Sequence, residues 1–313
     1  MVKMLESGSS CVDNIFKNMS DLDFDSNADL ARYSTMKLAC RAPLAIAKTI
    51  QAVQQFVQLC SKTNTKYKVL GWGANQLLVD GAEFIYLHLE FPFDSSVLDS
   101  VKSEYVFPAS VSLAKLTSHA AKFGIKGWEV FTGIPASVGG AIFMNAGTNL
   151  GEIGSVVTKV GIVQTDGSIR EEKITKDSFS YRHNKFCRPG EVIVWVEMTH
   201  QGLDEAVSSQ IRDYLRLRND SQPLNRPTCG CMYKNYDFDG MTCRAGLSLD
   251  IMGLKGLSFG GVRVSQKHAN FMENTDNATR DDVLSLARIV SSELKLSLGL
   301  EFELEVDTGD RPF

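Results

Sequence analysis

Two cysteines separated by one glycine, Cys229 and Cys231, are the side chains whose type and spacing first suggest chemistry. A free thiol with its ordinary pKa of about 8.5 is mostly protonated at neutral pH and can donate a proton to a carbanion. An inert, buried Cys231 is the alternative interpretation. The two cysteines do not suit zinc, because zinc sites use a wider spacing between ligands and a second ligand pair. Lys267 and His268 are a further candidate for metal binding or acid–base chemistry, but a structural role is the favoured interpretation. We therefore expect no metal site.

Two glycine-rich segments could hold a ligand through their backbone. The first segment consists of Gly71, Trp72, Gly73, Ala74, Asn75, Gln76 and Leu77. The second spans residues 133–147 and contains Gly133, Gly139, Gly140 and Gly147. Glycines allow backbone amides to approach a diphosphate or a flat ring closely. A tight turn, or a glycine-rich bend in a sheet, would explain either segment taken alone.

The elements that must position these residues mix strands with helices. Apolar periodicity and capping residues predict helices at residues 45–62, 113–123, 205–218 and 281–298. Short apolar runs predict strands at residues 68–70, 84–89, 159–165, 168–174, 192–198 and 301–306. Asp166 and Gly167 predict a hairpin turn, and Thr279 and Gly299 are the expected ends of the last helix. We expect an α+β protein in three parts, after a mobile polar lead-in that ends near Ser26.

Composition restricts the class of protein and its partners. The chain has 313 residues, 43% of them hydrophobic and 22% charged, which is enough for two or three domains. Its net charge of −4 gives no bulk attraction for nucleic acid or an anionic membrane. No apolar run reaches the ~18–20 residues of a membrane helix, and residues 1–19 lack the apolar centre of a signal peptide. The seven scattered cysteines indicate free thiols and not a disulfide framework. From these features together, we expect a cytoplasmic monomer that binds neither nucleic acid nor membrane.

Seven motifs, in the right order between Asp29 and Asp307, resemble those of the UDP-N-acetylenolpyruvoylglucosamine reductase family. They are the two glycine segments and the runs Leu30 to Thr35, Ser180-Tyr181-Arg182, Cys229 to Asn235, Ala245 to Phe271 and Glu303-Leu304-Glu305-Val306. The resemblance implies a flavin-binding fold of the vanillyl-alcohol-oxidase type, made of two α/β subdomains, with a third α+β domain that covers the substrate. The short chain suggests the family's compact subtype, which lacks a tyrosine-bearing loop.

The resemblance also implies domain boundaries and a reaction. Residues 27–90 with 299–313 would form the first FAD-binding subdomain, residues 91–203 the second, and residues 204–298 the substrate-binding domain. The implied reaction is the FAD-dependent reduction of UDP-N-acetylglucosamine enolpyruvate to UDP-N-acetylmuramate by NADPH, in bacterial peptidoglycan synthesis. The FAD would be non-covalent, because neither glycine segment contains a His or Cys in its core.

Roles of single residues follow from the same resemblance. Arg182 would meet the substrate carboxylate, Glu305 would stabilise developing charge, and Cys231 would donate the proton in place of the family's serine. The implied FAD-binding residues are Gly71, Trp72, Gly73, Ala74, Asn75, Gln76, Leu77, Gly133, Ile134, Pro135, Ala136, Val138, Gly139, Gly140, Asn145, Ala146, Gly147 and Ile153. The implied substrate-binding residues are Tyr181, Arg218, Lys234 and Asn235.

The chain departs from the family pattern at several positions besides Cys231. Leu38-Ala39-Cys40 replaces Ile-Gly-Gly, Tyr236 replaces a proline, Leu247 replaces a lysine and Asp307 replaces an arginine. Two alternatives therefore stay open: another FAD oxidoreductase of the same fold, and a protein that holds flavin or a UDP-sugar without turnover. The first leaves the third-domain motifs unexplained, and the retained Arg182 and Glu305 argue against the second.

Overall fold

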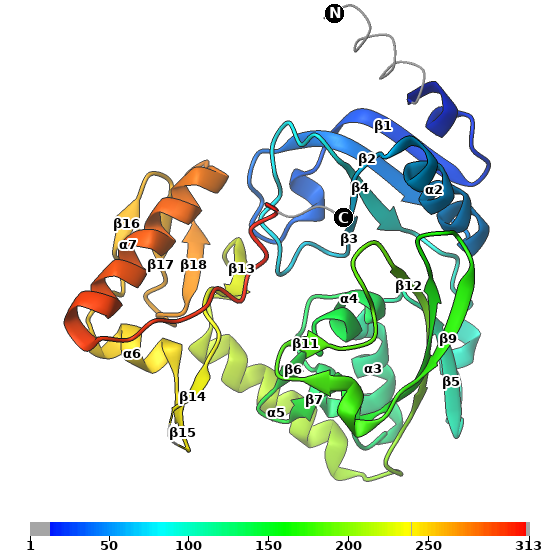
Figure 1. Ribbon diagram of the computed structural model, residues 1–313. Helices are drawn as coiled ribbons and strands as arrows, with labels where there is room; N and C mark the ends of the chain where they lie inside the picture. The colour runs from blue at the N-terminus through cyan, green and yellow to red at the C-terminus, as the bar shows by residue number, and fades with distance from the viewer. Residues whose placement is uncertain (1–12, 239, 311–313) are drawn as a thin grey trace, which may run out of the picture.

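Three four-stranded sheets organise residues 13–238 and 240–310, which are the residues that the computed structural model describes (Figure 1). Three two-stranded hairpins accompany the sheets: β6–β7 (Gly147–Thr148 and Gly151–Glu152), β10–β11 (Phe179–Ser180 and His183–Asn184) and β14–β15 (Tyr236–Phe238 and Met241–Cys243). Short 3-10 helices lie at Ala31–Tyr33, Ser95–Leu98, Glu129–Phe131, Ile153–Ser155 and Lys176–Ser178. The mixture confirms the predicted α+β class.

The first sheet contains a strand–helix–strand unit. Its order is β1-β2-β4-β3, with strands β1 (Leu22–Asp29), β2 (Arg41–Ala47), β4 (Ile85–Leu89) and β3 (Tyr67–Leu70). Both β2 and β3 pair with β4 in parallel, and α2 (Ile50–Thr63) connects β2 to β3. The predicted start of this helix at residue 45 is wrong, because residues 45–47 complete β2 and Thr49 caps the helix by accepting a hydrogen bond from Ala52 N.

The predicted mobile lead-in is wrong over its described part. Residues 13–17 are helical, and β1 pairs with β2 in antiparallel orientation. The ring of Phe16 is fully buried, with ring centroids 5.3 Å from Phe24 and 5.2 Å from Phe56. The alternating aspartates Asp23 and Asp25 are exposed because successive side chains of an edge strand point to opposite faces. The remainder of this prediction falls on residues 1–12, outside the described residues.

The second sheet is antiparallel and carries helices α3 to α5. Its order is β5-β12-β8-β9, with strands β5 (Glu104–Pro108), β12 (Val192–Thr199), β8 (Val157–Val163) and β9 (Ile169–Lys173). The helices are α3 (Leu113–Phe123), α4 (Val138–Phe143) and α5 (Ala206–Ser221). The structure confirms the predicted bounds of α3 and the β8–β9 hairpin, in which Gly167 has a φ of 80°. The helix α4, inside the second glycine segment, was not predicted.

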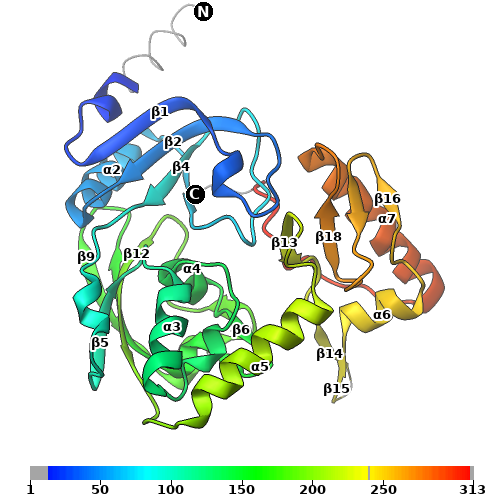
Figure 2. The same cartoon turned by 180° about the vertical axis from the view of Figure 1, so that it is seen from behind.

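The third sheet lies beside the other two and packs on helix α7 (Figure 2). Its order is β13-β18-β17-β16, with strands β13 (Thr228–Cys231), β18 (Phe271–Asn274), β17 (Val262–Val264) and β16 (Ser258–Phe259). Its helices are α6 (Ala245–Ile251) and α7 (Arg280–Leu298). The predicted ends of α7 are confirmed, since Thr279 and Asp282 form a reciprocal capping box and Gly299 has a φ of 66°. Among the described residues, no helix has both the length and the apolar character needed to cross a membrane.

The C-terminal tail, residues 300–310, is extended without forming the predicted strand at residues 301–306. The tail leaves α7 and returns toward the first sheet, in red in Figure 1. Glu305 N donates to Met232 O at 2.8 Å, whereas Asp307 N donates to Asn75 O at 2.9 Å. The prediction is wrong because the tail changes its hydrogen-bond partner between residues 305 and 307, so no continuous ladder forms.

The capping box of α7 supports a prediction about stability. Thr279→Ala should lower the free energy of unfolding by about 1 kcal/mol, because the N–H of Asp282 loses its side-chain acceptor. Urea denaturation followed by circular dichroism measures this change. Thr279→Ser keeps the oxygen and should stay close to the wild type. An equal loss in the serine variant would show that the threonine methyl group, and not the cap, is responsible.

Candidate active site

A cleft of about 1290 Å³ is bordered by residues from all three parts of the fold. Its walls include both glycine segments, the turn between β10 and β11, helix α5, strand β13 and the tail. Sites for one small molecule usually measure ~300–1,000 Å³. The cleft therefore has room for more than one ligand.

The first glycine segment leaves backbone amides available to a ligand. Gly73 has a φ of 59°, and a Cβ at this position would lie 2.0 Å from Tyr33 O, so only glycine fits. Over the described part of the chain, the N–H groups of Trp72, Gly73 and Ala74 donate no hydrogen bond. Successive free amides in a glycine turn form a concavity that suits a diphosphate. This segment therefore fits the diphosphate of FAD.

The second glycine segment lies against the first in the wall of the cleft. A Cβ at Gly71 would lie 3.6 Å from Ser137 Oγ and 4.0 Å from Gly140 Cα. Ser137 caps α4 by accepting a hydrogen bond from Gly140 N at 3.3 Å. A Cβ at Gly139 would lie 2.7 Å from the Cβ of Ala109, so this helix must pack closely on the chain behind it. Both segments thus contribute glycine backbone to the wall of the cleft.

Most of the predicted FAD-binding residues line the cleft, and four do not. Those that line it are Gly71, Trp72, Gly73, Ala74, Asn75, Gln76, Gly133, Ile134, Pro135, Ala136, Gly139, Gly140, Ala146 and Gly147. The side chains of Leu77, Val138 and Ile153 lie in the hydrophobic cores behind the cleft. The fourth residue, Asn145, is buried and donates to Glu152 Oε2 at 2.6 Å and to Ser180 O at 3.1 Å. These four side chains support the cleft wall from behind.

The three predicted catalytic residues all line the cleft, although they come from distant parts of the chain. Arg182 Nε donates to Glu305 Oε1 at 2.9 Å, and its guanidinium lies 4.9 Å from the centre of the Tyr181 ring. Arg182 occupies the two-residue turn between β10 and β11 and has a φ of 54°. This backbone conformation is uncommon for residues other than Gly, Asn and Asp. The third residue, Cys231, ends β13.

Burial dominates the ionisation of the groups around Cys231. It raises the pKa of the Cys231 thiol to about 12, Glu305 acts in the same direction, and Arg182 acts to lower that pKa. The expectation of an ordinary thiol pKa is therefore wrong. Burial also raises the pKa of Glu305, while Arg182 acts to lower it. The cleft thus favours a protonated thiol beside a paired arginine and glutamate.

Three of the four predicted substrate-binding residues line the cleft: Tyr181, Arg218 and Asn235. Arg218 Nη1 donates to Thr132 O at 2.8 Å, and burial lowers the pKa of Arg218. Asn235 Oδ1 accepts from Ala245 N at 3.0 Å, which ties the residue to the start of α6. Lys234 is not among the lining residues; its Nζ lies 3.2 Å from Glu303 Oε2.

Several polar residues of the cleft were not predicted from the sequence. They are Lys68, Tyr214, Arg244 and Lys255. Only Lys68 carried a signal, a charge within an apolar strand. His268 also lines the cleft, and its Nδ1 accepts from Asn270 N at 3.2 Å. Across residues 13–238 and 240–310, no group of side chains suited to a metal ion is found.

Comparison with known proteins covers both sides of the cleft. Residues 42–172 match the profile of the FAD binding domain, and residues 222–308 match that of the C-terminal domain of UDP-N-acetylenolpyruvoylglucosamine reductase. UDP-N-acetylenolpyruvoylglucosamine reductase 1 of Bacillus cereus is 33% identical over 285 residues, 90% of this chain and 93% of that protein. The Chlamydia pneumoniae reductase is 33% identical over 88% of this chain and 89% of its own. The crystal structure of the Thermus caldophilus reductase has a TM-score of 0.76 at 29% identity, covering 91% of this chain and 98% of its own.

The raised pKa of Cys231 predicts its reactivity. With a pKa of about 12, only about 10⁻⁴ of the thiol is ionised at pH 8. Alkylation of Cys231 by iodoacetamide should therefore increase roughly tenfold per pH unit from about pH 7 to about pH 10. Mass spectrometry of the peptide that contains Cys231 measures the rate, with glutathione as the solution control. A plateau near pH 9, as for glutathione, would contradict the raised pKa.

Proposed function

Since this chain belongs to the UDP-N-acetylenolpyruvoylglucosamine reductase family, we propose that it carries out the FAD-dependent reduction of UDP-N-acetylglucosamine enolpyruvate to UDP-N-acetylmuramate. One observation carries the proposal for the site: Arg182, Cys231 and Glu305 share a cleft with the bare backbone of both glycine segments. NADPH as the reductant, a cytoplasmic location and a monomeric state remain predictions.

The residues present fit FAD. The free amides at residues 72–74 would hold its diphosphate, and the wall from Gly133 to Gly140 would face its flat ring system. When bound, FAD would accept a hydride from NADPH and deliver it to the enolpyruvyl double bond. The protein must then orient the substrate, stabilise the charge that develops on it and provide a proton.

Arg182 would stabilise the charge that develops on the substrate carboxylate. Hydride addition to one end of a double bond conjugated with a carboxylate moves negative charge onto that carboxylate. The guanidinium is permanently charged and offers donors in a fixed plane. Its Nε donates to Glu305 at 2.9 Å and its Nη2 donates to Gly147 O at 3.3 Å, so the guanidinium is oriented before the substrate arrives. Such preorganised donors stabilise a transition state without further rearrangement.

Cys231 would supply the proton. Its raised pKa of about 12 keeps the thiol protonated at neutral pH, which a proton donor requires. A carbanion-like carbon next to a carboxylate is a far stronger base than a thiolate, so the transfer remains favourable. Arg182 and Arg218 both act to lower the pKa of Cys231 and would stabilise the thiolate until it regains a proton from solvent.

Binding and turnover assays test the proposal against both alternatives. The purified protein should be yellow, and acid denaturation should release FAD into the supernatant because no covalent tether is expected. With the enolpyruvyl substrate present, it should oxidise NADPH, followed by absorbance. A flavoprotein that oxidises NADPH only with an alcohol or sugar acceptor would indicate a different oxidoreductase. A protein that binds flavin and the UDP-sugar without turnover would be a binding protein.

The proposed role of Cys231 predicts which half of the reaction fails on mutation. Cys231→Ala should still allow NADPH to bleach the yellow band, but its reoxidation by the enolpyruvyl substrate should slow by ~10²–10⁴-fold, the usual contribution of a general acid. Cys231→Ser restores a hydroxyl donor and should recover most of that rate. Stopped-flow absorbance measures the two half-reactions separately.

Cys229→Ala is the matched control for this experiment. Cys229 lies on the same strand but is buried in the core of the third sheet. Its replacement should cost some stability while leaving both half-reactions near the wild-type rate. If the Cys231→Ala variant reoxidised its flavin at the wild-type rate, Cys231 would have only a packing role.

The raised pKa of the Cys231 thiol also predicts the pH dependence of turnover: the wild-type enzyme should show no loss from ionisation of this thiol up to about pH 10.

A further inference from the structure

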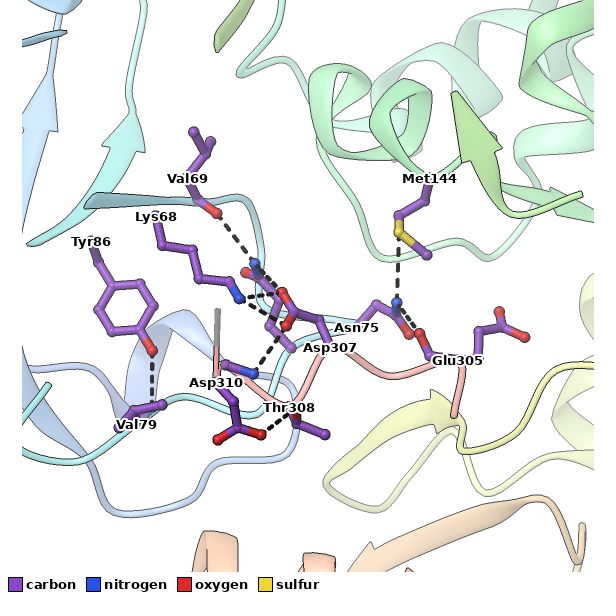
Figure 3. Close-up of polar contacts among 12 residues, drawn as sticks. Lys68, Val69, Asn75, Val79, Tyr86, Met144, Glu305, Asp307, Thr308 and Asp310 are labelled. Carbon is purple, nitrogen blue, oxygen red and sulfur yellow. Dashed lines mark hydrogen bonds and ion pairs between the residues drawn. The ribbon is translucent and has the colours of Figure 1, made fainter. Parts of the chain in front are cut away.

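Glu305, in the tail, is held by two other segments of the chain, one of which is drawn in Figure 3. On one side, Glu305 N donates to Met232 O at 2.8 Å, which attaches the residue to the chain just after β13. On the other side, Asn75 Nδ2 donates to Glu305 O at 3.0 Å, which attaches it to the first glycine segment. The position of the Glu305 carboxylate beside Arg182 therefore depends on how the tail is seated between these two segments.

Two residues further on, an ion pair fixes the tail to the first sheet. Lys68 Nζ lies 2.8 Å from Asp307 Oδ1 and 2.7 Å from Asp307 Oδ2. The Lys68 side chain comes from β3 and is only 5% exposed, whereas that of Asp307 is 37% exposed. The Asp307 carboxylate also accepts from Gly309 N at 2.9 Å and from Gln76 Nε2 at 3.3 Å. This carboxylate is thus held by donors from both the sheet and the tail.

The backbone of Asp307 is held at the same place. Its N–H donates to Asn75 O at 2.9 Å, and its carbonyl accepts from Leu77 N at 2.8 Å. Backbone hydrogen bonds alone would tolerate a slip along the tail, because every residue offers the same groups. A slip of one residue in extended chain reverses the side to which each side chain points. The ion pair with Lys68 is specific to one residue and so selects one register.

We propose that the Lys68–Asp307 ion pair is a positioning device that fixes the register of the tail and thereby holds Glu305 against Arg182 in the cleft. The role in catalysis rests on the proposed function. Lys68 and Asp307 act through Glu305 and are positioning residues, not catalytic ones.

Hydrogen exchange tests the clamp without reference to activity. Asp307→Asn keeps the shape of the side chain and removes its charge; at a 37% exposed position it should fold normally. The purified Asp307→Asn protein and a Lys68→Met protein should exchange the amides of Glu305, Asp307 and Leu77 at least roughly tenfold faster than the wild type. Asp310→Asn is the matched control. It removes another carboxylate of the same tail, and that carboxylate pairs with Arg280. Its exchange at these three amides should be unchanged.

The two half-reactions test the effect on Glu305. Asp307→Asn and Lys68→Met should each slow flavin reoxidation by the enolpyruvyl substrate roughly tenfold, an effect of the size that residues in contact have on one another. Each variant should keep the rate of flavin reduction by NADPH within about threefold of the wild-type rate. The double variant should be no slower than the slower single variant, because both changes break the same contact. FAD affinity, measured by titrating the flavin fluorescence, should stay within about threefold, which a general loss of structure would not allow.

Three results would overturn the proposal. The first is unchanged exchange in both variants, which would show that the pair does not hold the tail. The second is faster exchange with normal reoxidation, which would separate the tail from Glu305. The third is a loss that adds in the double variant or falls equally on both half-reactions. If the wild type itself fails to reoxidise with the substrate, the proposed function is wrong and the catalytic role of the pair fails with it, even where exchange confirms the clamp.

Discussion

The hydrogen-bonded ion pair between Arg182 and Glu305 is the contact on which the arrangement of the cleft depends. The two side chains are 19% and 14% exposed, and charges withdrawn from water to this degree need a partner. Arg182 belongs to a hairpin beside the second sheet, and Glu305 belongs to the tail that follows α7. Pairing them requires the hairpin and the tail to meet beside both glycine segments, because Arg182 Nη2 also donates to Gly147 O at 3.3 Å and Glu305 O accepts from Asn75 Nδ2 at 3.0 Å.

The same pair explains why burial decides the state of Cys231. Glu305 raises the pKa of the thiol and Arg182 lowers it, so the two neighbouring charges largely oppose each other. What remains is the cost of removing a thiolate from water. A pKa raised from 9.0 to about 12 disfavours the thiolate by roughly 4 kcal/mol, more than an exposed ion pair contributes. A neutral pair of opposite charges thus leaves the neighbouring thiol neutral as well.

The sequence predicted elements well where local chemistry determines them. Helix α3 has the predicted bounds, and the capping box of α7 involves residues three positions apart. Predictions were wrong where tertiary hydrogen bonds decide. The tail has the apolar alternation of a strand, yet its partner changes from residue 232 to residue 75. The apolar run at residues 45–47 fits a helix as well as a strand, and pairing with both β1 and β4 makes it part of β2.

The candidate site shows a related division. Motifs indicated Arg182, Cys231 and Glu305, and these residues meet in the cleft. Asn145 belongs to the same motifs but lies behind the wall, where its amide holds Glu152 and Ser180. A motif contains both side chains that contact a ligand and side chains that support the loop, and it does not separate the two kinds. Lys68 belongs to no motif, and its contact with Asp307, 239 residues away in the sequence, becomes visible in the folded chain.

The ion pairs in the cleft leave its unpaired cations unevenly distributed. Lys68 pairs with Asp307, Arg182 with Glu305, and Lys255 with Asp250. Within the described part of the chain, the cleft cations that remain without a carboxylate partner are Arg218, Arg244 and Lys267. All three follow residue 204, in the part of the chain that forms α5 and the third sheet. Although the chain has a net charge of −4, one side of its cleft is therefore positively charged. The diphosphate of a nucleotide sugar would be attracted to that side. At the glycine segments, the groups available to a ligand are backbone amides and not cationic side chains.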